Sequence, residues 1–102
     1  MSNITLPNGY TMQTTFFSDF TIADKFGLDA IKQTFDNAFK SYKYNHIYLT
    51  EIAIVTSNKS CEWYGKNEQY MNLYAECYHK VDDWCMKHLK ADELEYYLKA
   101  TD

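Results

Sequence analysis

The sequence contains no arginine, although it carries ten lysines among its 102 residues. Arginine is the side chain that reads guanine and phosphate with two parallel hydrogen bonds. Fourteen acidic residues outweigh the lysines and give a net charge of −4, whereas nucleic-acid binding usually needs a positive surface that neutralises phosphates. We therefore expect no direct contact with DNA or RNA.

Glycine and proline are also scarce, with three and one residues, while 46% of the chain is hydrophobic. Such proportions exclude collagen-like, linker and disordered sequences, and they suit one compact domain. Apolar runs stay far below the ~20 residues of a membrane span. The three cysteines are an odd number, and the first residues lack the pattern of a secretory signal. We therefore expect reduced thiols in a cytoplasm, and no membrane partner.

The first 17 residues are predicted to form an extended arm or a β-hairpin. Asn8-Gly9 follows Pro7 and is a strong turn signal between two short segments of strand-forming residues. Residues 18–102 are predicted to form a helical body of four to five helices. The predicted fold is thus a single, mainly α domain that spans residues 1–102.

Two helices and one ambiguous stretch are predicted in the first part of the helical body. A short helix at about 21–26 stops at Gly27, and the next covers 28–43, where apolar residues repeat on one face. The stretch 46–64 is ambiguous. Residues 52–56 are rich in β-branched side chains and could form a strand, but apolar spacing over the whole stretch favours a helix.

The longest helix is predicted to follow Asn67, whose side chain can cap it. Its apolar residues alternate in steps of four and three, the pattern of a helix-packing seam, and they are Tyr70, Tyr74, Cys77, Val81, Trp84 and His88. A final short helix is predicted to be capped by Asp92.

A zinc site is one interpretation of Cys85 and His88, which are spaced like two ligands on one helix. Further ligands would have to come from Cys61, His46 or an acid elsewhere in the fold. The favoured interpretation is that both residues occupy the packing seam, since cysteine is among the most buried residue types. We therefore predict no metal ligand and no cofactor.

Catalysis is not predicted either. Cys77 and His79 are two residues apart and would point to different faces of a helix. The sequence contains no glycine-rich phosphate loop, nucleophile elbow or zinc-protease motif. We predict that the protein is not an enzyme and has no catalytic residue.

Tyrosine and acidic residues supply the candidate binding surface. The chain has ten tyrosines, which either fill a core poor in leucine or provide contacts to a partner. Residues 82–102 hold six acids against three lysines, which form either a binding surface or an ordinary solvated helix surface. The predicted binding residues are Asp82, Asp83, Asp92, Glu93, Glu95 and Tyr96.

Three segments resemble small proteins encoded by phages and prophages of Firmicutes: residues 16–31, residues 48–52 and the closing residues 93–102. That group supplies no catalytic motif, so no functional residue is carried over from it. The resemblance implies that the protein binds and blocks a host protein, as anti-CRISPR proteins do. The expected partner is a host nucleic-acid-handling defence protein, such as a CRISPR effector with a basic surface. The alternatives are a homodimeric structural or regulatory phage protein and a zinc-stabilised binding module.

Overall fold

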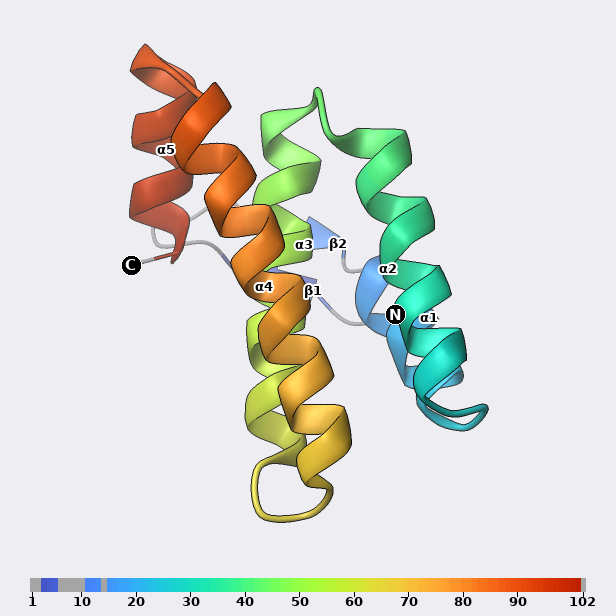
Figure 1. Ribbon diagram of the computed structural model, residues 1–102. Helices are drawn as coiled ribbons and strands as arrows, with labels where there is room; N and C mark the ends of the chain where they lie inside the picture. Colours follow the sequence, from blue (N-terminus) through green and yellow to red (C-terminus); the bar gives the residue numbers. More distant parts are fainter. Residues whose placement is uncertain (1–2, 6–10, 14, 102) are drawn as a thin grey trace.

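The computed structural model describes residues 3–5, 11–13 and 15–101. Five helices dominate this part of the chain (Figure 1), which confirms the mainly helical body. They are α1 (Thr15–Asp24), α2 (Leu28–Tyr42), α3 (His46–Trp63), α4 (Glu68–His88) and α5 (Ala91–Thr101).

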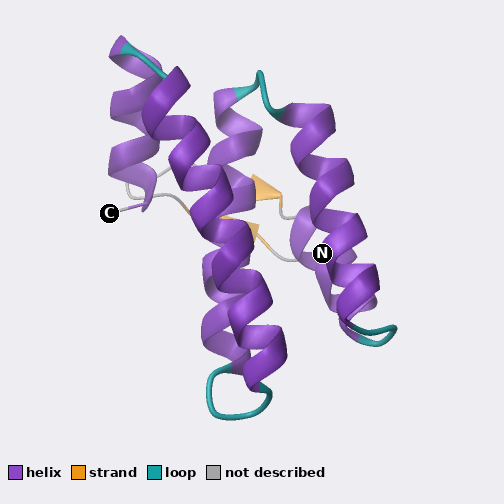
Figure 2. Cartoon of the chain, viewed as in Figure 1, coloured by secondary structure: helices purple, strands orange, loops and turns teal. Residues whose placement is uncertain are grey.

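Consecutive helices run in opposite directions, and short loops connect them (Figure 2). α1 and α2 form one antiparallel hairpin, and α3 and α4 form a longer one with the most extensive contact in the molecule. α5 turns back from the end of α4 and packs on both α3 and α4. No described helix has the length and apolar character needed to cross a membrane.

Two short strands, β1 (Asn3–Thr5) and β2 (Thr11–Gln13), precede the helices and pair antiparallel. Ile4 lies opposite Met12 in this pairing. The turn predicted at Pro7–Gly9 lies outside the described residues, so the hairpin as a whole stays a prediction.

Local signals explain where α2, α3 and α4 begin. Gly27 precedes α2 with a φ of 112°, a conformation that favours glycine. The side chain of Asn45 accepts hydrogen bonds from the backbone N–H groups of Ile47 and Tyr48 at the start of α3. Asn67 caps α4 through Tyr70, as predicted.

The ambiguous stretch 46–64 is helical, as favoured, in spite of its β-branched residues. The central turns of α3, residues 49–56, are buried on nearly every side, and the two threonines there satisfy their own hydrogen bonds. The Thr50 hydroxyl donates to the carbonyl oxygen of His46 at 2.7 Å, and the Thr56 hydroxyl donates to that of Ile52 at 2.8 Å. Both bonds span one helical turn, so a threonine can lie inside this helix without an unpaired hydroxyl.

Two predicted helix boundaries are wrong. α1 begins at Thr15 rather than near residue 21, because Phe16, Phe20 and Ala23 form a helical stripe that is buried in the core. The extended segment therefore ends before residue 15, not at residue 17. Asp92 does not precede α5 but lies in its first turn, where its negative charge suits the positive end of the helix.

The last turn of α4 buries other residues than the predicted packing seam. A pattern of fours and threes averages 3.5 residues per turn, whereas a straight α-helix has 3.6, so the buried stripe drifts around the helix. By the last turn Cys85 and Leu89 are buried, while His88 is exposed and Trp84 is half-buried. Upstream, Tyr74, Cys77 and Val81 are buried, as the prediction requires.

Candidate interaction surface and the clamp behind it

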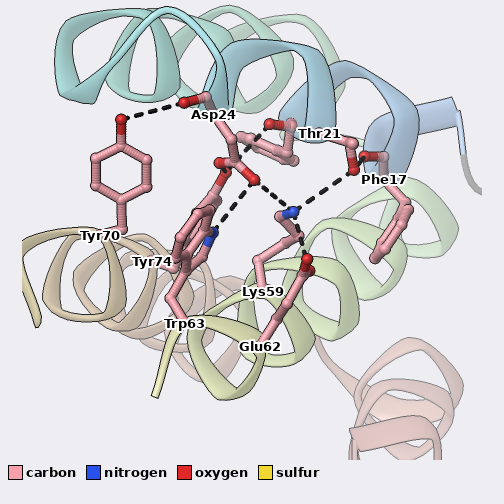
Figure 3. Close-up of polar contacts among 9 residues, drawn as sticks. Phe17, Thr21, Asp24, Lys59, Glu62, Trp63, Tyr70 and Tyr74 are labelled. Carbon is pink, nitrogen blue, oxygen red and sulfur yellow. Dashed lines mark hydrogen bonds and ion pairs between the residues drawn. The ribbon is translucent and has the colours of Figure 1, made fainter. Parts of the chain in front are cut away.

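Asp24, near the end of α1, is the centre of a polar cluster that joins three helices (Figure 3). Its Oδ2 lies 2.5 Å from the Lys59 Nζ and accepts a hydrogen bond from the Trp63 indole N–H at 3.2 Å. Its Oδ1 accepts a short hydrogen bond from the Tyr74 hydroxyl. The Tyr70 hydroxyl donates to the Asp24 backbone carbonyl at 3.1 Å. We call these five residues the clamp.

Lys59 is the unusual member of the clamp because its side chain is fully buried. A buried charge is tolerated only when it is paired and hydrogen-bonded. Besides Asp24, its ammonium lies 3.0 Å from the Glu62 carboxylate and 3.5 Å from the Thr21 hydroxyl. The ring of Phe17, with its centroid 5.2 Å away, covers another side of the ammonium. The charge of Lys59 is therefore compensated within the chain.

The tyrosines of the clamp hold the end of α1 against α4. Tyr74 is fully buried and its ring packs edge-on against Phe20, with centroids 5.6 Å apart. Burial, and then the hydrogen bond to Asp24, raise the pKa of Tyr74 above its ordinary value. Tyr74 thus stays protonated and donates its hydrogen bond over the whole physiological pH range. The clamp is a closed structural site that positions α1.

In the described part of the chain, the opposite face of α1 forms one wall of a groove of about 610 Å³. α2 forms the other wall, and Tyr48 of α3 closes one end. Small residues lie at its bottom, where Ala23 and Ala38 are buried. Large apolar side chains stand at its edge: Ile22 is 55% exposed and Phe26 is 77% exposed. We call this feature the α1–α2 groove.

Three aromatic rings build the end of the groove near Tyr48. The rings of Tyr42 and Tyr48 lie 4.8 Å apart, and Phe16 meets the Tyr42 ring edge-on at 5.4 Å. Phe16 is buried, whereas Tyr42 and Tyr48 keep 38% and 40% of their surface exposed. Aromatic rings that are held by packing and still exposed are typical anchors of protein interfaces.

The predicted binding residues lie elsewhere, on the end of α4 and on α5, and most have contacts within the chain. Asp82 accepts a hydrogen bond from the buried Tyr97 hydroxyl at 2.6 Å. Glu93 lies 3.4 Å from the His46 ring, and the ring of Tyr96 packs edge-on against the same histidine. Glu95 pairs with Lys99, one helical turn away, at 2.7 Å.

Four of the predicted acids, Asp83, Asp92, Glu93 and Glu95, are exposed, and of these Glu93 and Glu95 have the contacts just described. Glu93 and Tyr96 meet around His46, but Asp82 serves mainly to hold α5 on α4. The structure therefore brings part of the predicted set together, and none of it lines the α1–α2 groove.

Cys85 and His88, the residues considered for a metal site, differ in their exposure to solvent. Cys85 is fully buried, whereas His88 is exposed and stacks on Trp84 with ring centroids 3.7 Å apart. Within residues 16–101, no group of three or more histidines, cysteines and acids is arranged to hold a metal ion. Burial raises the pKa of the Cys77 and Cys85 thiols to about 12. Both thiols are therefore protonated at neutral pH and poor nucleophiles.

Sequence reasoning missed both the clamp and the groove. The groove had a signal: Ile22 and Phe26 are four residues apart and form a second apolar stripe beside Phe16, Phe20 and Ala23. The clamp had none, because Asp24 and Lys59 are far apart in the chain.

Comparisons of the chain with protein-family models, with curated proteins and with solved structures find no match. The geometry of the groove and the charge of the chain are therefore the features that indicate a function.

Proposed function

We propose that this protein binds another protein in a one-to-one complex and thereby blocks it. The observation that carries the proposal is the α1–α2 groove, which leaves Ile22, Phe26, Tyr42 and Tyr48 exposed around a hollow. Large apolar side chains that surround a depression mark binding sites more often than chance exposure does.

The proposed target is a host nucleic-acid-handling defence protein, with a CRISPR effector as the concrete case. Such proteins carry basic surfaces for nucleic acids, and a chain with a net charge of −4 is attracted to them. The acids on α4 and α5, including the exposed Asp83 and Asp92, would steer the encounter. The groove would supply the contact that keeps the two proteins together.

A pull-down from a phage-host lysate tests the proposal, with mass spectrometry to identify the captured protein. The bait is compared with a Phe26→Ser variant, in which one groove edge is polar. Tyr64→Ser is the matched control, because Tyr64 is 76% exposed against 77% for Phe26 and does not line the groove. We expect one host protein to be captured by the wild type and by the control, and to be lost with Phe26→Ser.

Added salt should weaken this capture if the acids steer the encounter. Purified wild-type protein should also inhibit the captured host protein at equal molar amounts. Capture of nothing beyond the bait would end the proposal. Elution of the wild type as a dimer, with no host partner, would instead favour the alternative, a homodimeric structural or regulatory phage protein.

A further inference from the structure

The α1–α2 groove has the dimensions of a binding site for a helix. It follows two antiparallel helices, and its lining on α2 runs from Ala30 to Tyr42, which corresponds to about 18 Å. A partner helix of three to four turns would therefore fit along its whole length.

Its cross-section also suits a helix. Small side chains at the bottom, Ala23, Ala30 and Ala38, let a third helix approach closely. The exposed side chains of Ile22 on α1 and Asn37 on α2 lie on the two walls. Side chains of an incoming helix can pack between such ridges, as amphipathic helices do when they bind apolar grooves. A peptide that binds by adding a β-strand would need an unpaired strand edge, whereas the described walls of this groove are helical.

The charge in the groove indicates which charge the partner helix should carry. Asp19 carries the one charge among the described lining residues, and the polar remainder, such as Thr34 and Asn37, is neutral. The lysines of α1, α2 and the loop between them, which are Lys25, Lys32 and Lys40, are all outside the lining. Among the described lining residues, an incoming helix therefore meets a single carboxylate and no cation.

We propose that the α1–α2 groove binds an amphipathic helix of the partner protein, with an apolar face against the alanines and a lysine or arginine beside Asp19. This inference rests on the proposed function, because it assumes that the protein acts by binding another protein. It adds the secondary structure, the polarity and the charge of the segment that is recognised.

A display library of helix-forming 14-residue peptides tests the inference on the full chain. Peptides are selected on the wild type, and their affinities are measured by fluorescence anisotropy. We expect selected peptides to be helical when bound, with apolar residues three and four positions apart and one basic residue. Ile22→Glu should weaken their binding more than tenfold, because it introduces a charge at the apolar edge.

A charge swap tests the contact with Asp19. Asp19→Lys should weaken the selected peptides about fivefold, and replacing the basic peptide residue by glutamate should restore the affinity. The matched control is Asp83→Lys, which changes the net charge by the same amount at an exposed position of α4. Its affinity for the peptides should stay within about twofold of the wild-type affinity.

Selected peptides that bind Ile22→Glu as well as the wild type would overturn the inference, and so would a selection that yields no binders. Acidic or extended peptides would overturn it as well. These outcomes leave the proposed function intact if the pull-down still captures a host protein, so the two failures can be told apart.

Discussion

The two faces of α1 show opposite ways to use side chains on one short helix. Its inner face carries Phe20 and Asp24, and every polar atom of the Asp24 carboxylate is paired with α3 or α4. Its outer face carries Ile22, which is 55% exposed beside a hollow. The inner face is paired with α3 and α4, and the outer face lines the α1–α2 groove, where we propose that a partner binds. The predictions below test this division.

The largest effect is expected from Asp24→Ala, which breaks the clamp. It leaves Lys59 buried with Glu62 as its remaining carboxylate partner, and it removes the acceptor for Trp63 and Tyr74. Loss of one partner from a buried pair costs about 3–5 kcal/mol of unfolding free energy, measurable by urea denaturation. Adding Lys59→Met should recover part of the loss, since it removes the unpaired charge. A loss below about 1 kcal/mol would show that the clamp does not hold α1.

Glu51 sharpens the comparison, because it is a buried acid without the partners that Asp24 has. It is 1% exposed, and its Oε1 has no hydrogen-bond partner within residues 16–101. Burial raises its pKa from 4.5 to about 7. Since the folded pKa lies above the unfolded one, its contribution is most favourable below pH 4.5 and is lost as the pH rises to 7.

Glu51→Gln should therefore stabilise the protein at pH 8 by on the order of 3 kcal/mol relative to its effect at pH 4.5. Urea denaturation of both proteins across this pH range measures the difference. Because all other titrating groups are shared, parallel pH profiles for the two proteins would contradict the prediction.

Tyr97→Phe tests a second buried tyrosine–aspartate hydrogen bond, which joins α4 and α5. Tyr97 is fully buried and donates to Asp82 at 2.6 Å. Loss of this hydrogen bond should cost about 1–2 kcal/mol in thermal or urea unfolding. In an Asp82→Asn background the same change should cost less, because the bond to a charged acceptor is already weakened. An equal cost in both backgrounds would exclude the bond as the cause.

Phe26→Ser should have the smallest effect on stability, although it removes a large apolar side chain. Phe26 is 77% exposed, so its loss should change the unfolding free energy by no more than about 0.5 kcal/mol. Chemical denaturation beside the Tyr64→Ser control measures this. A destabilisation of about 2 kcal/mol would mean that the groove edge belongs to the core, and would break the contrast between the two faces.

The sequence predictions are correct where the deciding interactions join residues that are close in the sequence, and they fail where distant residues decide the structure. α2 and the cap of α4 depend on neighbours within a few residues, such as Gly27 and Asn67, and both are confirmed. The predicted start of α1 was wrong, although Phe16 and Phe20 are spaced as on one face of a helix. Its buried stripe was masked by the strand-forming residues before it, and tertiary packing decided the outcome.

The candidate sites show the same limit more strongly. The clamp joins Asp24 to Lys59 and Tyr74, and only the folded chain brings such distant residues together. The acidic surface was inferred from a local excess of charge, which does not reveal that Asp82 is bound by Tyr97. Charge patterns predict where acids are, but folding decides which of them stay available.

Hydrogen exchange of the protein, alone and in complex with its captured partner, tests the central claim most directly. If the outer face of α1 is the binding surface, amide protection on complex formation should concentrate in residues 16–26 and 30–48, on both walls of the groove. Protection confined to residues 82–96, with the groove exchanging as in the free protein, would contradict the account and assign binding to the acidic helices instead.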